Sequence, residues 1–183
     1  MYRLGSIATA FALAVTSVFA QGAQPTTKPN DAQIAHIAYT AGVLDVEAGK
    51  QALAISKNKD VREFAQQMVK DHTAVNDQAL ALVKKLKVTP EDNATSKGLT
   101  EQASARRAEL AKLSGAAFDK AYMSHMVDDH KQDVAEFKKE ANGGKDGDVK
   151  GFAAKTLPTL EEHLKLAQTT NDAVKKGAKT ASK

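Results

Sequence analysis

The 183-residue chain contains no cysteine and no tryptophan, and only 5% of its residues are aromatic. The absence of cysteine excludes a disulfide framework, a thiolate metal site, a cysteine nucleophile and lipid attachment at an N-terminal cysteine. The 26 basic and 22 acidic residues leave a formal net charge of +4, which is too small to indicate a nucleic-acid-binding surface. We therefore expect no nucleic-acid partner. Much of the apolar content is alanine, which predicts a core of small, closely packed side chains.

Long apolar runs are also scarce, and the only one lies at the N-terminus. Residues 1–20 combine an early cation, Arg3, with an apolar stretch and the small-residue end Val18-Phe19-Ala20. This pattern predicts a signal peptide cleaved after Ala20, and export to the bacterial periplasm. An N-terminal membrane anchor is the alternative, although the stretch is short for a span. No later stretch approaches the roughly 20 apolar residues that cross a bilayer, so we expect no transmembrane segment in the mature protein.

The rest of the chain has the apolar periodicity of helices, with apolar residues at three- and four-residue steps and no alternating strand pattern. Four long helices are expected, and they begin near Asp31, Asp60, Ala116 and Asp148. Asp60 with Glu63 forms a plausible capping pair for the second of them. Four helices of this length can bury a common core, so the sequence predicts an all-α fold, a four-helix bundle.

Composition marks the borders of this bundle. Residues 21–30 hold two prolines among polar residues and are expected to form a flexible leader. The bundle is expected to span residues 31–174, with a polar connector at 88–115 that includes a shorter helical stretch. Residues 175–183 are expected to be a flexible basic tail.

An internal repeat supports this organisation. Residues 45–65 align without a gap to residues 133–153. The matches include Asp45 with Asp133, Phe64 with Phe152, and Ala65 with Ala153. Each copy spans the end of one helix, a turn and the start of the next. This predicts two related helical hairpins joined by a long crossover, the ferritin-like arrangement, with equivalent starts for helices two and four and with both phenylalanines buried. Chance matches between lysine- and alanine-rich helices are the alternative.

Helical phase separates the five histidines. His72, His130 and His163 lie on or at the edge of the apolar faces of three different helices, each near the middle of its helix, whereas His36 and His125 point away from those faces. We therefore expect the first three to converge inside the bundle and the other two to lie on the surface.

Two aspartates accompany the interior histidines. Asp45 and Asp133, equivalent in the repeat, lie at the margins of their apolar stripes. Imidazoles with flanking carboxylates suit zinc, copper or iron, so His72, His130 and His163, with Asp45 and Asp133 nearby, form a candidate metal site. The alternative is that each core histidine is neutral and hydrogen-bonded to an acid, a tyrosine or a backbone carbonyl.

Other polar and sulfur-bearing residues near these histidines receive structural interpretations. Asp71 and Asp129 each precede a core histidine and are interpreted as solvated residues or as partners within the helix turn. The methionines Met68, Met123 and Met126 are interpreted as core filler rather than copper ligands.

Three segments carry a resemblance to a known family. FAQQMVKDHT (64–73), LSGAAFDKAYMSHMVDDH (113–130) and KTLPTLEEHLKLA (155–167) resemble the domain-of-unknown-function family numbered 4142, and the resemblance extends over residues 31–167. It implies an exported bacterial protein with a ferritin-like bundle, often labelled an outer-membrane protein, and it supplies no established activity. The family's motif histidines correspond to His72, His130 and His163.

The chain differs from the ferritin-like di-iron enzymes at the position three residues before each of these histidines. Those proteins carry Glu three residues before a ligating His, whereas here Val69, Val127 and Leu160 precede the three histidines. A di-iron centre is therefore not expected, and no Ser-His-acid arrangement suggests a hydrolase. The function predicted is a periplasmic bundle that binds a transition metal. The alternative is a non-catalytic structural or stress-related envelope protein without metal, and an enzyme is the least supported class.

Overall fold

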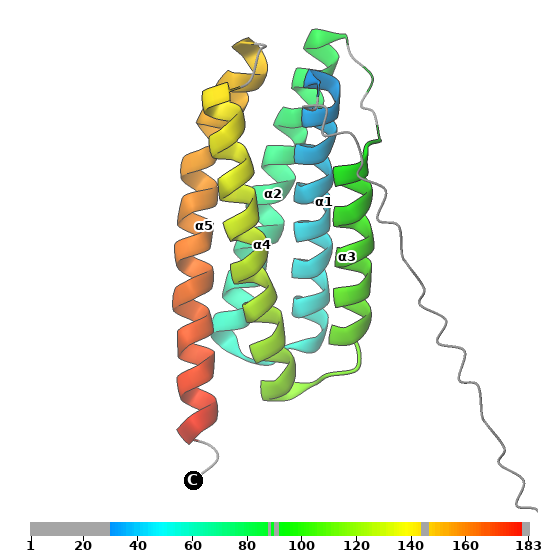
Figure 1. The fold of residues 1–183 in the computed structure, drawn as a ribbon. Coiled ribbons are helices and arrows are strands. Elements are labelled where there is room, and N and C mark those ends of the chain that lie inside the picture. The colour runs from blue at the N-terminus through cyan, green and yellow to red at the C-terminus, as the bar shows by residue number, and fades with distance from the viewer. Residues whose placement is uncertain (1–29, 88, 90–91, 144–146, 181–183) are drawn as a thin grey trace, which may run out of the picture.

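The computed structural model describes residues 30–87, 89, 92–143 and 147–180. The predicted signal peptide 1–20, and the predicted leader up to residue 29, lie outside the described residues. The described residues form five helices that run side by side (Figure 1). They are α1 Asp31–Ile55, α2 Lys59–Leu86, α3 Ala94–Leu110, α4 Gly115–Gly143 and α5 Gly147–Thr180. The fold is all-α, as the periodicity predicts.

The helices pack as two hairpins with one additional helix. Helices α1 and α2 form the first hairpin, and α4 and α5 form the second; α2 and α5 provide the main contact between the two. Helix α3 packs along the outer flank of α1 (Figure 1). It occupies most of the predicted connector 88–115 and is 17 residues long, longer than expected. A capping box explains its start, because the Asn93 side chain accepts from the Ser96 backbone N–H and the Ser96 hydroxyl accepts from that of Asn93.

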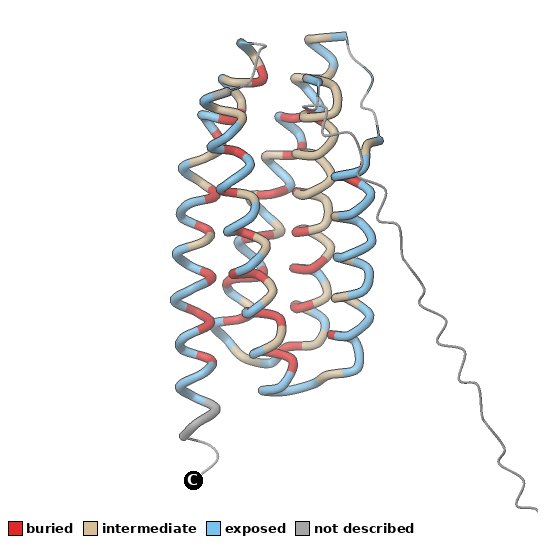
Figure 2. The backbone as a smooth tube through the Cα atoms, in the orientation of Figure 1, coloured by how far each residue is buried: buried red, intermediate tan, exposed pale blue. Residues whose placement is uncertain are grey.

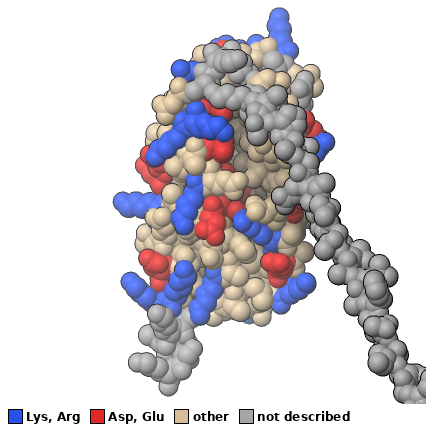
Figure 3. All heavy atoms as spheres, viewed as in Figure 1, with Lys and Arg blue, Asp and Glu red and all other residues tan. Residues whose placement is uncertain are grey.

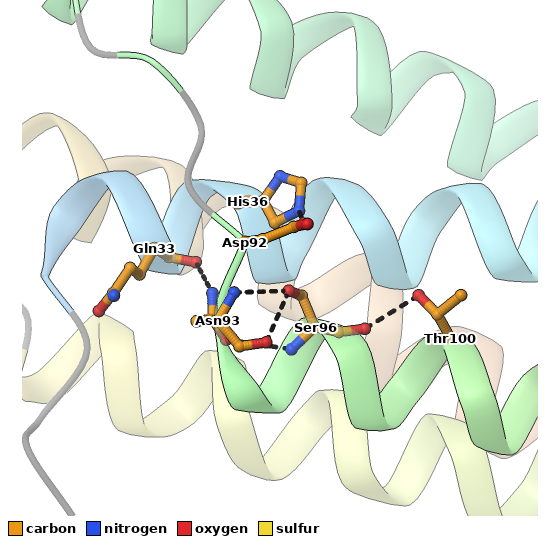
Figure 4. A network of polar contacts seen from close by, with 6 residues as sticks. All are labelled: Gln33, His36, Asp92, Asn93, Ser96 and Thr100. Atoms are coloured by element: carbon orange, nitrogen blue, oxygen red, sulfur yellow. Dashed lines mark hydrogen bonds and ion pairs between the residues drawn. The ribbon is translucent and has the colours of Figure 1, made fainter.

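A polar network fastens the start of α3 to α1 (Figure 4). His36 Nε2 lies 2.8 Å from Asp92 Oδ1, and Asn93 Nδ2 donates to the Gln33 carbonyl oxygen at 3.4 Å. Within α3, the hydroxyl of Thr100 donates to the Ser96 carbonyl oxygen one turn earlier, at 2.9 Å. The contacts of His36 with Asp92 and of Asn93 with Gln33 hold the crossover against the N-terminal half of α1.

The starts of α2 and α5 are equivalent in the repeat, since Lys59 aligns with Gly147, and each lies one residue before the expected start. The expected capping pair of Asp60 and Glu63 is wrong for α2. The N-cap is Asn58, whose Oδ1 accepts from the backbone N–H of Asp60 at 2.9 Å. Asp60 instead lies in the first turn, where a carboxylate interacts favourably with the helix dipole.

The core is densest where α2 and α4 carry their aromatic and methionine side chains. The largest fully buried side chains there are Phe64, Met68, Phe118, Tyr122 and Met123. Phe118 stacks on Tyr122 with ring centroids 5.8 Å apart, and Phe64 meets Tyr122 edge-on at 6.2 Å. Buried positions line the inner faces of the helices along this half of the bundle (Figure 2).

The opposite half of the bundle is more open. There α1 carries small residues such as Ala38 and Ala41, which leave unfilled volume, and a groove of about 790 Å³ lies between all five helices. Phe152 lines this groove and is only half-buried, in contact with Phe137 at 6.2 Å. The expectation that Phe152 is buried like its repeat equivalent Phe64 is therefore wrong.

Helix α5 continues further than expected, through Thr180, so most of the predicted flexible tail 175–183 is helical. Val174 is buried, and the lysines and alanines that follow are good helix formers, which explains the extension. On the face shown in Figure 3 the basic and acidic side chains are interspersed. Among the helices of the described residues, none combines the length and apolar character of a membrane span.

Candidate metal centre

The structure brings three of the five histidines together at the middle of the bundle. His72 comes from α2, His130 from α4 and His163 from α5, and their exposed fractions are 2%, 0% and 3%. Their ring centroids lie 5.0–5.6 Å apart. One ring nitrogen from each lies within 4.8 Å of the other two. We call this group the histidine triad.

His130 is anchored from within its own helix. Its Nδ1 lies 2.9 Å from the Met126 carbonyl oxygen one turn earlier. Because a carbonyl oxygen can only accept, Nδ1 of His130 carries the hydrogen. In the neutral ring Nε2 then presents a lone pair.

His163 is anchored by an acid on the neighbouring helix. Its Nε2 lies 2.9 Å from Asp71 Oδ2, and the same oxygen accepts from Gln67 Nε2 at 2.5 Å. A carboxylate acceptor places the hydrogen on Nε2 and leaves the lone pair on Nδ1. Sequence analysis missed this role of Asp71. Asp71 immediately precedes His72, and the two side chains are separated by about 100° around α2. His72 can therefore belong to the triad while Asp71 reaches His163 on α5.

His72 is the most loosely held of the three. Its Nδ1 lies 3.5 Å from Asp45 Oδ2, beyond the usual hydrogen-bond distance. Asp45 is buried, with 6% exposure, and shares a hydrogen bond with the carboxyl group of Asp133. Burial raises the pKa of both carboxyls, and the proximity of the two acids raises the pKa of Asp133 further.

The remaining ring nitrogens of the triad have no protein partner. Nε2 of His72, Nε2 of His130 and Nδ1 of His163 are buried and make no hydrogen bond. Burial lowers the pKa of His72 and of His163, and the neighbouring imidazoles lower both further; Asp71 opposes the shift at His163. The neutral imidazole is the form that binds metal ions. Buried nitrogens without a partner are costly, and a bound cation would satisfy all three.

The donor set fits a late first-row transition metal. Metal–nitrogen bonds of about 2.0–2.1 Å in a tetrahedral site place donors about 3.3 Å apart, so a small closure of the present spacing forms the site. Imidazole nitrogen suits zinc, copper and iron better than calcium or magnesium, which prefer oxygen. Three protein donors leave a fourth position for a water or another ligand.

The other candidate residues lie outside the triad. Asp45 lies behind His72, 3.5 Å from its Nδ1, where it can orient and polarise the ring, and Asp133 hydrogen-bonds to Asp45. His36 and His125 are separate from the triad and half-buried, His36 paired with Asp92 and His125 lining a small cavity.

A second polar group lies between α3 and α4. Asp129 is half-buried and forms an ion pair with Arg106. Burial raises the pKa of Asp129, and Arg106 opposes that shift. The Tyr122 hydroxyl is buried without a hydrogen-bond partner, and burial raises its pKa, with further contributions from Asp45 and Asp129. Asp129 is thus a partner of Arg106 rather than a member of the triad.

Comparison with known proteins places the chain in a family. The model of the domain of unknown function DUF4142 matches residues 16–170. The chain belongs to the DUF4142 family. No curated protein matches it. Among solved structures, it is similar to the DUF305 protein from Streptomyces coelicolor, described as a candidate secreted protein, with 15% identity and a TM-score of 0.64 over 75% of this chain and 88% of that one. At this identity the likeness shows the helical fold alone.

Proposed function

We propose that this DUF4142 protein is an exported, periplasmic bundle of ferritin-like type that binds one transition-metal ion through His72, His130 and His163. Two related hairpins joined by a long crossover support the ferritin-like assignment. The N-terminal pattern that ends at Ala20 supports export. The observation that carries the metal proposal is the arrangement of the ring nitrogens: one nitrogen of each imidazole faces an oxygen acceptor, and the other is buried and unpaired.

A core histidine that serves only packing gains nothing from having one ring nitrogen at an oxygen acceptor and the other buried without a partner. A structural histidine is stabilised by pairing both of its polar nitrogens or by reaching solvent, whereas a metal-binding histidine characteristically donates its outer N–H to a carboxylate or carbonyl. The triad follows the second pattern at His130 and His163. The role of Asp45 and Asp133 in this proposal is to support His72 from outside.

Metal-dependent stabilisation tests the proposal. The mature protein, produced without an affinity tag, is stripped of metal and melted with and without Zn²⁺, Cu²⁺ and Co²⁺. Because the site is assembled only in the folded state, an ion that binds there raises the melting temperature. Single replacement of His72, His130 or His163 by Ala should remove that rise, whereas His36→Ala and His125→Ala should retain it.

The competing function is a structural envelope protein without metal. It predicts no melting shift and no stoichiometric metal in protein purified from the periplasm. It also predicts that His36→Ala and the triad variants respond alike to added ions. The two proposals therefore separate in one set of melting curves.

A further inference from the structure

The groove in the open half of the bundle is large enough to hold a small molecule. It has a volume of about 790 Å³ and lies between all five helices. Pockets that bind small molecules commonly enclose about 300–1,000 Å³, whereas the voids inside a packed core are seldom much larger than a water molecule. The groove therefore has the size of a ligand site rather than of a packing defect.

The internal repeat shows which aromatic ring this half lacks. In the dense half of the bundle, Phe64 packs edge-on against Tyr122. The repeat equivalent of Phe64 is Phe152, and at the same spacing along the chain the equivalent of Tyr122 is Ile34. Both Phe152 and Ile34 line the groove and are half-buried. The open half thus has no ring in the place that Tyr122 occupies.

Two methionines of the dense half also have small equivalents. Met123 and Met126 are buried there. At the spacing of the repeat they correspond to Ala35 and Ala38, which both line the groove. The groove therefore occupies volume that an aromatic ring and two flexible thioether chains fill in the other half. The dense half shows what chemistry fits this volume.

The charges around the groove favour an uncharged occupant. Among the described residues that line it, those of α1, α2, α3 and α5 are all uncharged, and the charged ones come from α4 alone. Glu136 and Lys139 of α4 are exposed and pair with each other at 3.2 Å. A charge moved from water onto apolar walls without a partner is strongly penalised.

We propose that the groove is a binding site for an uncharged aromatic small molecule, which takes the place that Tyr122 and the two methionines hold in the dense half. Phe137 and Phe152, with ring centroids 6.2 Å apart, both line the groove, and they offer ring edges and faces to such a ligand. This site is separate from the histidine triad, and the inference does not depend on metal binding.

The chain itself supplies no such ring from the predicted leader. Residues 21–29 are polar, include Lys28 and contain no aromatic residue. A leader of this composition does not match the apolar walls, so the occupant is expected to be a separate molecule.

A fluorescent probe of the same chemistry tests the site. N-phenyl-1-naphthylamine is uncharged and aromatic, and its emission rises when it enters an apolar site. Titrated into metal-free mature protein, it should bind saturably with one probe per chain. Ala38→Met gives the groove the side chain that Met126 supplies in the dense half, and Ala38→Phe gives it a larger one. Both should raise the dissociation constant by about tenfold or more, because even one methylene group changes binding in an apolar pocket by about that factor.

The melting temperature of the ligand-free variants gives a second measurement. Ala38→Met should raise it, because the new side chain fills empty volume. Ala54→Met is the matched control, since it places the same side chain at an exposed position of α1 outside the groove. It should bind the probe as the wild type does. Circular dichroism checks that each variant is folded.

A charged analogue and the oligomeric state complete the test. The sulfonated probe 1-anilinonaphthalene-8-sulfonate carries similar rings and a negative charge, and it should bind at least about tenfold more weakly. Equal affinity for the two probes would overturn the uncharged ligand class. Absence of saturable binding by the wild type, or wild-type affinity in both Ala38 variants, would overturn the site. Probe binding that weakens as a dimer forms in sedimentation experiments would also overturn it, by showing that a second copy covers the groove.

Discussion

Asp71 holds His163 from outside the triad, with its Oδ2 2.9 Å from Nε2 of the imidazole. The contact joins α2 to α5, and it determines which nitrogen of His163 faces the other two histidines. A carboxylate at this place fixes both the tautomer and the ring orientation.

Replacement of Asp71 by Asn should therefore weaken metal binding. The amide can donate as well as accept, so it no longer forces the hydrogen onto Nε2 of His163. We expect the dissociation constant for Zn²⁺ to rise about 10- to 100-fold, as is typical when such an outer partner is lost. Isothermal titration calorimetry measures the change. Asp77→Asn, an exposed position on the same helix, serves as the control, and equal effects of the two substitutions would contradict the assignment.

Acid should destabilise the metal-free protein through the triad. Burial lowers the pKa of His72 and of His163, so below about pH 6.5 the unfolded chain binds protons that the folded state does not. The stabilisation is thus present above the unfolded pKa and is lost as the pH falls toward the folded pKa. Each imidazole contributes a slope of up to about 1.4 kcal/mol per pH unit. Urea unfolding between about pH 7 and 5 should show a shallower slope for His72→Gln, and an unchanged slope would rule this out.

The carboxyl pair of Asp45 and Asp133 should have the opposite effect on stability from the histidines: it should destabilise the protein as the pH rises. Burial and the proximity of Asp45 raise the pKa of Asp133, so the folded state retains a proton that the unfolded chain releases above about pH 4. This contribution is complete below the unfolded pKa and is lost as the pH rises through the folded pKa. Asp133→Asn cannot ionise. Its free energy of unfolding, relative to wild type, should therefore be higher at pH 8 than at pH 4, as measured by denaturant titration at both values.

The two repeat-equivalent phenylalanines should differ in their energetic weight. Phe64 is 1% exposed and packs against Tyr122, so Phe64→Ala should lower the free energy of unfolding by about 3–5 kcal/mol. Phe152 is half-buried beside the groove, and Phe152→Ala should cost clearly less. Denaturation midpoints of the two variants give the comparison, and equal losses would show that the groove closes in solution.

A side chain at Gly42 should destabilise the protein. A Cβ at this position would overlap the side-chain amide of Asn76, so Gly42→Ala must displace an amide buried between α1 and α2. Overpacking of this kind costs about 1–3 kcal/mol. Gly151 provides the matched control: it is helical, and a Cβ there meets nothing within 4 Å. Gly151→Ala should stabilise the protein by about 0.5–1 kcal/mol, so thermal melts of the two variants should shift in opposite directions.

Helical phase was sufficient to predict the all-α fold and to select His72, His130 and His163, because the side of a helix on which a residue lies follows from its spacing alone. Contacts that depend on how the helices are rotated relative to one another could not be predicted from the sequence. Asp71 meets His163 across two helices, and the acceptor for His130 is the Met126 main chain, which every residue type shares. The repeat correctly paired the starts of α2 and α5 but not the burial of Phe152, because that depends on what the opposite hairpin presents.

The origin of the three histidines has a mechanical consequence. His72 belongs to the first hairpin, whereas His130 and His163 belong to the second. An ion held by all three is a reversible cross-link between halves that are otherwise joined mainly along α2 and α5. In a chain without cysteine, the proposed link would take the place that a disulfide holds in many exported proteins. Metal supply would then determine how far the two hairpins can move apart, and with them the walls of the groove.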